Sequence, residues 1–236
     1  MANLDRHPVV SHAQWLEARK AFMKREKELT RLRDQLAEER RALPWERIEK
    51  PYAFDGPRGR ESLGDLFDGK SQLLVYHFMY PKSWEEGCKS CSFWMDSLER
   101  NVVHLAARDL AVAVVSISPL AKLEAFRKRL GWTFHWVSSE PSDFNRDFGV
   151  TFTDDEIAQK LPLYNYGTMA HPVTEGPGIS VFYRNPKGEI FHTYSTYTRG
   201  LDPLNAAYQL LDLVPKGRDE DALPYTMSWL RHRDRY

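Results

Sequence analysis

The sequence predicts an α/β fold: a mixed β-sheet flanked by helices, with a long helical arm at the N-terminus. Three observations lead to this prediction. Short apolar runs, of the kind that strands covered on both faces need, alternate with stretches of helical spacing. Two β-rich runs joined by a turn follow, as in an antiparallel hairpin. Ahead of them lies an apolar seam with a period of seven residues.

The arm is expected to form a helix over about residues 12–43. Ser11 and Gln14 fit a capping box, in which each side chain accepts a hydrogen bond from the other residue's backbone N–H. Apolar residues then recur at every seventh position: Trp15, Phe22, Leu29, Leu36 and Leu43. Charges of both signs cover the other faces, as on a solvated helix. Such a seam packs on its own domain or on a second subunit, and we expect a homodimer through this arm.

After the arm, prolines and glycines between Pro44 and Gly59 indicate a linker or an irregular entry to the main domain. Strands are expected over residues 72–80, 110–117 and 132–139. The stretch after the first strand has helical spacing, and so does LAKLEAFRKRL after the second. Parallel strands connected by helices in this way form βαβ units.

The C-terminal part begins with a loop-rich stretch from about residue 140 to 178. GISVFYRNPKGEIFHTYS then predicts the hairpin, and PLNAAYQLLDLV (203–214) predicts a last helix with Pro203 at its start. We therefore divide the chain into the arm (1–48), a main α/β domain (49–215) and a tail packed on that domain (216–236).

Composition excludes several function classes. The 33 basic and 33 acidic residues cancel, so no overall field draws the chain to nucleic acid or to an anionic membrane. No run approaches the roughly 20 apolar residues that span a bilayer, and the N-terminus lacks the apolar core of a secretory signal. No glycine pattern indicates a nucleotide site. We expect a cytoplasmic protein that requires no cofactor.

The two cysteines, Cys88 and Cys91, lie in FMYPKSWEEGCKSCSFW, just after the first predicted strand. In a reducing cytosol, a close pair is more often catalytic or metal-binding than structural. Free N–H groups at the start of the following helix favour a thiolate at Cys88. Cys91, one turn later, is placed to attack a mixed disulfide at Cys88. Trp84 is expected to shield the sulfur from water and to contact the substrate.

A CxxC motif at a strand-to-helix turn, followed by a ββα end, resembles thioredoxin-like proteins. More narrowly, YHFMY...W..GCKSCSFW, GISVFYRNPKGEIFHTYSTYTRGLD and LLDLVPKGR resemble a bacterial family catalogued as domain-of-unknown-function family 899. This resemblance, over about residues 10–230, implies a thioredoxin-like fold but no established reaction. By analogy with thioredoxin, Cys88 attacks, Cys91 resolves, and Pro177 takes the place of the cis-proline that faces the cysteines. The longer MYPKSWEEG connection, the Lys-Ser dipeptide and Gly178 depart from the thioredoxin pattern.

The favoured function is thiol-disulfide exchange, with a disulfide-containing protein or a small oxidant as partner. One alternative is a redox-inactive thioredoxin-like protein that serves assembly or binding. Another is thiol-dependent peroxide reduction by Cys88, for which Ser92, Arg146 and Arg199 are candidates to hold the peroxide.

Two further readings concern ligands. A closed zinc site needs four ligands, and none of His77, His104, His135, His171 and His192 has tight spacing to the cysteines, so no metal is expected. In HTYSTYTRG (192–200), strand alternation places Tyr194 with Thr196 on one face and Ser195 with Tyr197 on the other. These hydroxyls and Arg199 would line a small substrate pocket, although such residues also simply fill strand positions.

Overall fold

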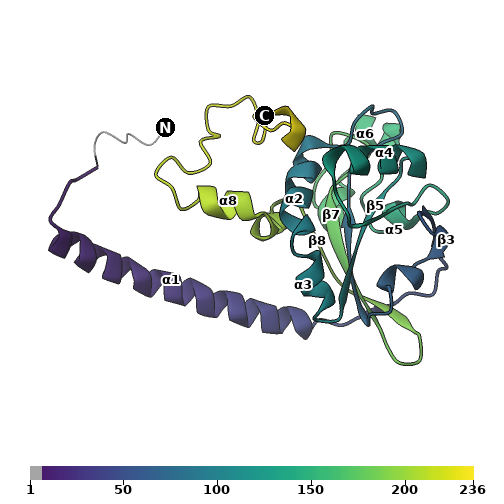
Figure 1. Ribbon diagram of the computed structural model, residues 1–236, viewed down its shortest axis with the longest axis horizontal. Coiled ribbons are helices and arrows are strands. Elements are labelled where there is room, and N and C mark those ends of the chain that lie inside the picture. The colour runs from purple at the N-terminus through teal and green to yellow at the C-terminus, as the bar shows by residue number, and fades with distance from the viewer. Residues whose placement is uncertain (1–6) are drawn as a thin grey trace.

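The computed structural model describes residues 7–236 (Figure 1). Its strands form one eight-stranded sheet within that range, in the order β1-β8-β7-β4-β5-β6-β2-β3. The central strand is β4 (Gln72–His77), with β5 (Leu110–Ser116) and β6 (His135–Ser138) parallel to it on one side. On the other side, β7 (Gly178–Arg184) and β8 (Ile190–Tyr197) form the antiparallel hairpin. The predicted mixed sheet and its thioredoxin-like element order are confirmed.

Helices connect the parallel strands as predicted. The crossover from β4 to β5 contains α2 (Lys89–Glu99) and α3 (Val102–Ala106), because the expected single helix breaks at Arg100 and Asn101. The crossover from β5 to β6 contains α4 (Leu120–Leu130). These helices lie on the same face of the sheet, as right-handed connections between successive parallel strands require.

Apolar residues cover both faces of the central strands, which explains their nearly continuous apolar sequence. On one face, Tyr76 and Val114 join a cluster formed with α2, α4 and the C-terminal segments. On the other face, Val75 and Val115 pack with phenylalanines such as Phe144 from α5 (Phe144–Asp147). Alternate residues of each strand therefore belong to different cores.

The segment predicted as a linker or an irregular entry contains strands, so that prediction was wrong. Here β1 (Glu46–Arg47) pairs with β8, while β2 (Ala53–Gly56) and β3 (Gly59–Ser62) form a hairpin at the other edge. Gly59 adopts a φ of 99°, so this glycine marks the hairpin's turn rather than a structureless linker. The 3₁₀ helix η2 (Asp65–Phe67) follows.

The C-terminal helix also starts later than predicted. Pro203 lies inside the 3₁₀ helix η3 (Thr198–Leu204), and α8 (Ala206–Leu211) begins after Asn205, whose side chain accepts from the Tyr208 N–H at 3.1 Å. The remaining short helices are α6 (Asp154–Ala158), α7 (Tyr164–Gly167) and η4 (Arg233–Arg235).

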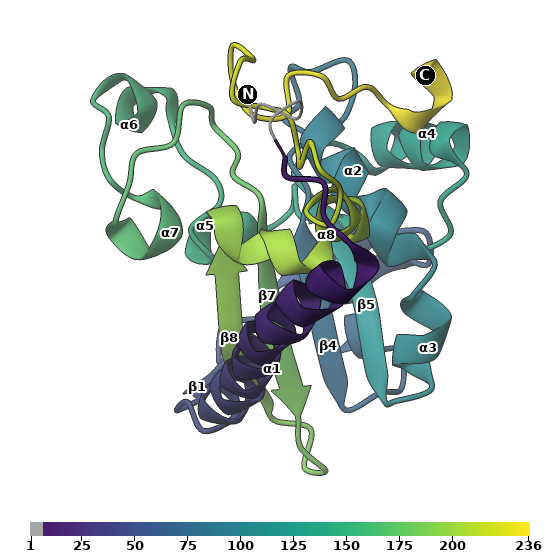
Figure 2. The same cartoon turned by 90° about the vertical axis from the view of Figure 1, so that its left-hand side faces the viewer.

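The arm is the helix α1 (His12–Arg41), and its capping box of Ser11 and Gln14 is confirmed. Figure 1 shows it projecting away from the sheet, and in Figure 2, which views the molecule from that side, it lies in front of β7 and β8. At its C-terminal end the Arg40 guanidinium stacks 4.8 Å from the centre of the Tyr194 ring of β8. No helix among the described residues is both long and apolar enough to cross a bilayer.

Candidate active site

The loop from β4 to α2 is held in place by close packing. The Cys88 N–H donates to the Met79 carbonyl at 3.1 Å, which folds the loop back on itself. Gly87 lies against two rings: a Cβ there would be 2.7 Å from Phe78 Cε1 and 2.9 Å from Phe126 Cε1. Only glycine fits this close approach without displacing a ring.

The C-terminal tail fixes the same loop from outside. His232, which is buried, donates from Nε2 to the Gly87 carbonyl at 2.9 Å. Glu86 accepts hydrogen bonds from Arg129 of α4 and from Arg235 of the tail. The segment just before Cys88 is therefore attached to two distant parts of the chain.

Cys88 is the N-cap residue of α2, and its Sγ accepts from the Cys91 backbone N–H at 3.5 Å. Both cysteines are free thiols; Cys88 is half-buried, whereas only 1% of Cys91 is exposed. A hydrogen bond from the Cys91 thiol lowers the pKa of Cys88 to about 7, with help from the backbone N–H groups of Cys91 and Ser90 and against the effect of burial. Burial, followed by contact with Cys88, raises the pKa of Cys91.

This asymmetry assigns different roles to the two sulfurs. Near neutral pH a large fraction of Cys88 is thiolate, the form that attacks disulfides. Cys91 keeps its proton and supplies a hydrogen bond to that thiolate. The expected helix-terminal nucleophile and its resolving partner are thus placed within contact of each other.

Two tyrosines that the sequence analysis did not select stand behind the pair. The Tyr76 hydroxyl and the Met79 N–H both act to lower the pKa of Cys91, against the larger effect of burial. Burial, and next the charge of Cys91, raises the pKa of Tyr76, so this hydroxyl remains a neutral donor. Tyr164 is also buried; its hydroxyl donates to the Pro177 carbonyl and accepts from the Thr198 N–H at 3.4 Å.

The three predicted substrate-contacting residues lie in different surroundings. Trp84 is half-buried and packs on the same apolar cluster as Cys88. Pro177 immediately precedes β7, but its peptide bond is trans, as are all those in the described range, so the expected cis-proline was wrong. Arg199 has a side chain that is 86% exposed and pairs with Asp202 at 3.2 Å.

The candidate peroxide-holding groups are engaged elsewhere. Ser92 donates through Oγ to the Cys88 carbonyl oxygen at 2.9 Å, and not to its sulfur. Arg146 makes a two-pronged ion pair with Glu156 and donates to the Thr151 carbonyl at 3.1 Å. Neither side chain contacts the Cys88 sulfur within the described part of the chain.

A buried polar chain crosses the opposite side of the hairpin. His77 bonds through Nδ1 to Asn145 Oδ1 at 3.0 Å and through Nε2 to Ser180 Oγ at 2.9 Å, and Ser180 connects to Ser195 at 2.9 Å. His192 Nε2 closes the chain at 2.7 Å from Ser195 Oγ. These histidines are thus satisfied structural groups, and no cluster of three or more His, Cys, Asp or Glu side chains suited to a metal occurs over residues 7–236.

The strand alternation predicted for residues 192–200 is confirmed. Ser195 and Tyr197 are buried, and the Tyr197 hydroxyl donates to the Phe148 carbonyl at 2.8 Å. Tyr194 lies on the other face, under Arg40. Arg199 belongs to η3 and does not join these hydroxyls in a common set of contacts.

The sequence pattern of a family described as bacterial protein of unknown function (DUF899) matches residues 4–236. The chain belongs to the DUF899 family. Among curated proteins, none matches it.

Solved structures similar to this DUF899 chain have titles that name peroxiredoxins and a thiol:disulfide interchange protein. A PrxQ variant from Xylella fastidiosa has a TM-score of 0.43 and 13% identity, covering 69% of this chain and 89% of its own. Peroxidoxin BcpB from Mycobacterium tuberculosis has a TM-score of 0.45 and 10% identity, covering 70% and 96%. A protein titled thiol:disulfide interchange protein DsbE, from Chlorobium tepidum, has a TM-score of 0.43 and 15% identity, covering 71% and 94%.

Proposed function

We propose that this protein is a thiol-disulfide oxidoreductase that uses Cys88 and Cys91, with a disulfide-containing protein or a small disulfide as its oxidised partner. The observation that supports it is the unequal environment of the two thiols. Cys88 caps a helix, is half-buried and has a lowered pKa, while Cys91 is enclosed and has a raised pKa. A purely structural pair would need no such difference.

The first step is attack of the Cys88 thiolate on one sulfur of the partner's disulfide. A bond forms between Cys88 Sγ and that sulfur, and the partner's disulfide bond breaks. The second partner sulfur leaves as a thiolate and takes a proton from solvent. Cys88 then carries a mixed disulfide and no charge. The hydrogen bond from the Cys91 thiol, which had stabilised the Cys88 thiolate, is therefore no longer needed there.

The second step uses Cys91. Its proton is released to solvent, and its sulfur attacks Cys88 Sγ, so that the Cys88–Cys91 disulfide forms while the bond between Cys88 Sγ and the partner sulfur breaks. That partner sulfur leaves as a thiolate and takes up the proton. Hydrogen bonds from the Tyr76 hydroxyl and the Met79 N–H stabilise the Cys91 thiolate that this step requires. Two electrons have then moved to the partner, and an external dithiol restores both thiols. The cycle needs no dissociable cofactor.

Exchange fits the site better than peroxide reduction. Peroxide reduction needs a guanidinium beside the attacking sulfur, whereas Arg146 is committed to Glu156 and Arg199 to Asp202. Exchange needs only a nucleophile and a neighbouring resolving thiol, which α2 supplies within a single turn.

Trapping of the intermediate tests this function. Cys91→Ser, incubated with a small aromatic disulfide, is expected to accumulate a mixed disulfide at Cys88 that intact-mass and peptide spectrometry identify. Cys88→Ser is the matched control and is expected to accumulate none at Cys91, because that thiol is enclosed. If neither variant forms an adduct while circular dichroism shows an intact fold, the redox-inactive assembly protein becomes the better account.

A further inference from the structure

The arm α1 presents an apolar stripe that no segment within residues 7–236 covers. None of its 30 residues is buried, and the exposed fractions are 52% for Trp15, 61% for Phe22 and 49% for Leu29. An amphipathic helix owes most of its stability to packing of its apolar side. We therefore expect the apolar stripe of α1 to pack against a partner surface.

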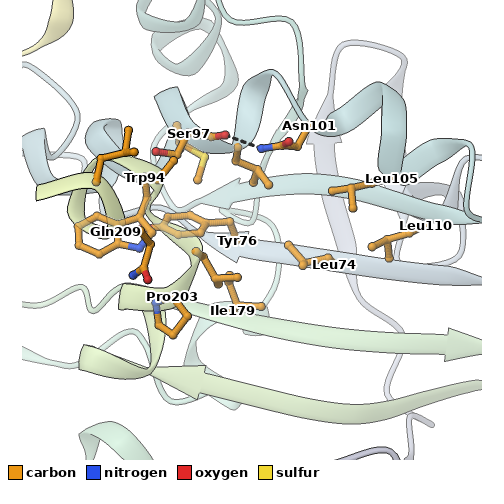
Figure 3. A pocket seen from close by; sticks show the side chains of 15 residues that line it. Leu74, Tyr76, Trp94, Ser97, Asn101, Leu105, Leu110, Ile179, Pro203 and Gln209 are labelled. Atoms are coloured by element: carbon orange, nitrogen blue, oxygen red, sulfur yellow. Dashed lines mark hydrogen bonds between the residues drawn. The ribbon is translucent and has the colours of Figure 1, made fainter. Parts of the chain in front are cut away.

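A second uncovered apolar feature lies on the main domain. It is a groove of about 590 Å³ above the sheet, shown in Figure 3. Its floor contains Leu74 and Tyr76 of β4 and Ile179 of β7. One wall comes from α2 and α3 and includes Trp94 and Leu105; the other comes from η3 and α8 and includes Leu204 and Leu210.

We propose that this groove receives the N-terminal half of α1 from a second copy of the chain, so that two copies exchange arms reciprocally. The dimensions agree. One end of the groove lies at Leu110, which pairs with Gln72 of β4, and the other end lies at Tyr76. From position 72 to position 76 the strand extends about 13 Å. Trp15 and Phe22 are seven residues apart, or about 10.5 Å along a helix. Both rings of the stripe therefore fit within one groove.

The arm cannot fill the groove of its own chain while it remains one helix. Its C-terminal end is attached to the sheet, where Arg40 stacks on Tyr194 and β1 pairs with β8. Trp15 lies about 38 Å further along the helix axis. Figure 1 shows α1 leading away from the domain. A second molecule is thus the available source of a matching helix.

Charge also favours this pairing. The first half of the arm (12–27) has five basic residues, Arg19, Lys20, Lys24, Arg25 and Lys27, against two acidic ones, Glu17 and Glu26. On the other side of α8, the adjoining cavity is lined by five acidic residues and three basic ones; the acidic ones are Asp202, Asp212, Asp219, Glu220 and Asp221. A basic helix end beside an acidic rim gains attraction that salt weakens.

The amount of surface reaches the size at which specific interfaces begin. Each docked arm would bury two aromatic side chains together with the groove beneath them. Two reciprocal contacts remove on the order of 1,000 Å² from water, the lower size limit of specific interfaces. Reciprocal exchange also closes the assembly at two copies, because each arm and each groove is then occupied.

Light scattering after size exclusion tests the proposal at several protein concentrations. The wild type is expected at the dimer mass at 10 µM, and Phe22→Glu and Leu210→Glu are each expected to weaken dimerisation at least tenfold. Leu213→Glu is the matched control: this leucine is 80% exposed, also near α8, and not part of the groove, so the variant stays dimeric. The proposal is overturned if the wild type is monomeric at 100 µM, or if neither Phe22→Glu nor Leu210→Glu weakens dimerisation.

Photo-crosslinking identifies which surfaces meet. A benzoylphenylalanine placed at position 22 in unlabelled protein is mixed with ¹⁵N-labelled protein of natural sequence. Links from position 22 to labelled peptides of α2, α3 or α8 support arm exchange. Links only between arms would show a coiled-coil dimer instead and would refute the groove as the docking site.

Discussion

Removing the thiol of Cys91 should change the reactivity of Cys88. The hydrogen bond from Cys91 is the largest cause of the lowered Cys88 pKa, which is about 7. At pH 7 about half of Cys88 is then thiolate. In Cys91→Ala this donor is lost, so the pKa should rise toward the ordinary value of about 8.5, where only about 3% is thiolate at pH 7. At that value the thiolate fraction of Cys88 at pH 7 is about 16-fold smaller, and the loss of alkylation rate is less than this because a thiolate of higher pKa is the better nucleophile.

The assay is the rate of iodoacetamide alkylation at Cys88, measured by mass spectrometry from pH 5.5 to 10. The rate in the wild type should rise with an inflection near pH 7, because alkylation follows the thiolate fraction. Cys91→Ser keeps a hydroxyl donor at the same place, so its inflection should lie between those of the wild type and Cys91→Ala. An unchanged profile in Cys91→Ala would refute the reasoning that the neighbouring thiol activates Cys88.

Three other predictions follow from the same contacts. Tyr76→Phe removes one donor to the Cys91 sulfur, so the lifetime of the mixed disulfide at Cys88 should increase about tenfold in single-turnover quench experiments, and an unchanged lifetime would exclude Tyr76 from resolution. Gly87→Ala should lower the free energy of unfolding in urea by about 1–3 kcal/mol because of the Phe78 and Phe126 contacts, whereas Gly64→Ala, whose Cβ would lie 3.5 Å from Ser62 Oγ and 3.9 Å from Ile190 Cδ1, should cost under about 1 kcal/mol. Burial raises the pKa of Glu175 to about 8, so the folded state retains this proton after the unfolded chain has released it. The free energy of unfolding should therefore fall as the pH rises from about 4.5 to 8. Glu175→Gln should flatten that slope in urea titrations at pH 5, 7 and 9.

Local patterns in the sequence were enough to place the proposed nucleophile, Cys88, at the start of a helix. A buried strand followed by Cys88 at a helix start is a short-range arrangement, and α2 begins where that pattern indicates. The sheet order also follows from local signals, because parallel units and a hairpin leave few topologies. What the sequence could not give were contacts between residues distant along the chain.

Three residues illustrate that limit. Tyr76 looks like one more ring in an apolar strand, and its role depends on α2 approaching β4. His232 contacts the Gly87 carbonyl although the two residues are 145 positions apart in the chain. No sequence pattern near either residue predicts that contact. Pro203 and Asn205 are both good helix-start residues, and tertiary packing, including burial of Asn205, decided in favour of the second.

The edge hairpin β2–β3 was missed for a different reason. Each strand has only four residues, too few for alternation to be recognised, and Gly56 and Gly59 were taken as breakers. In the structure these glycines face each other across the turn, and a Cβ on Gly56 would lie 2.0 Å from Glu61 Oε1. Glycine here permits strand formation rather than preventing it.

The most direct test of a working dithiol is its oxidation equilibrium. Wild-type protein is held in glutathione buffers of defined potential, alkylated, and weighed by intact-mass spectrometry. Loss of two hydrogen masses in a single cooperative step, absent from Cys88→Ser and from Cys91→Ser, is the predicted result. Two thiols that remain fully alkylatable after denaturation at every potential, in a protein that keeps its fold, would contradict it.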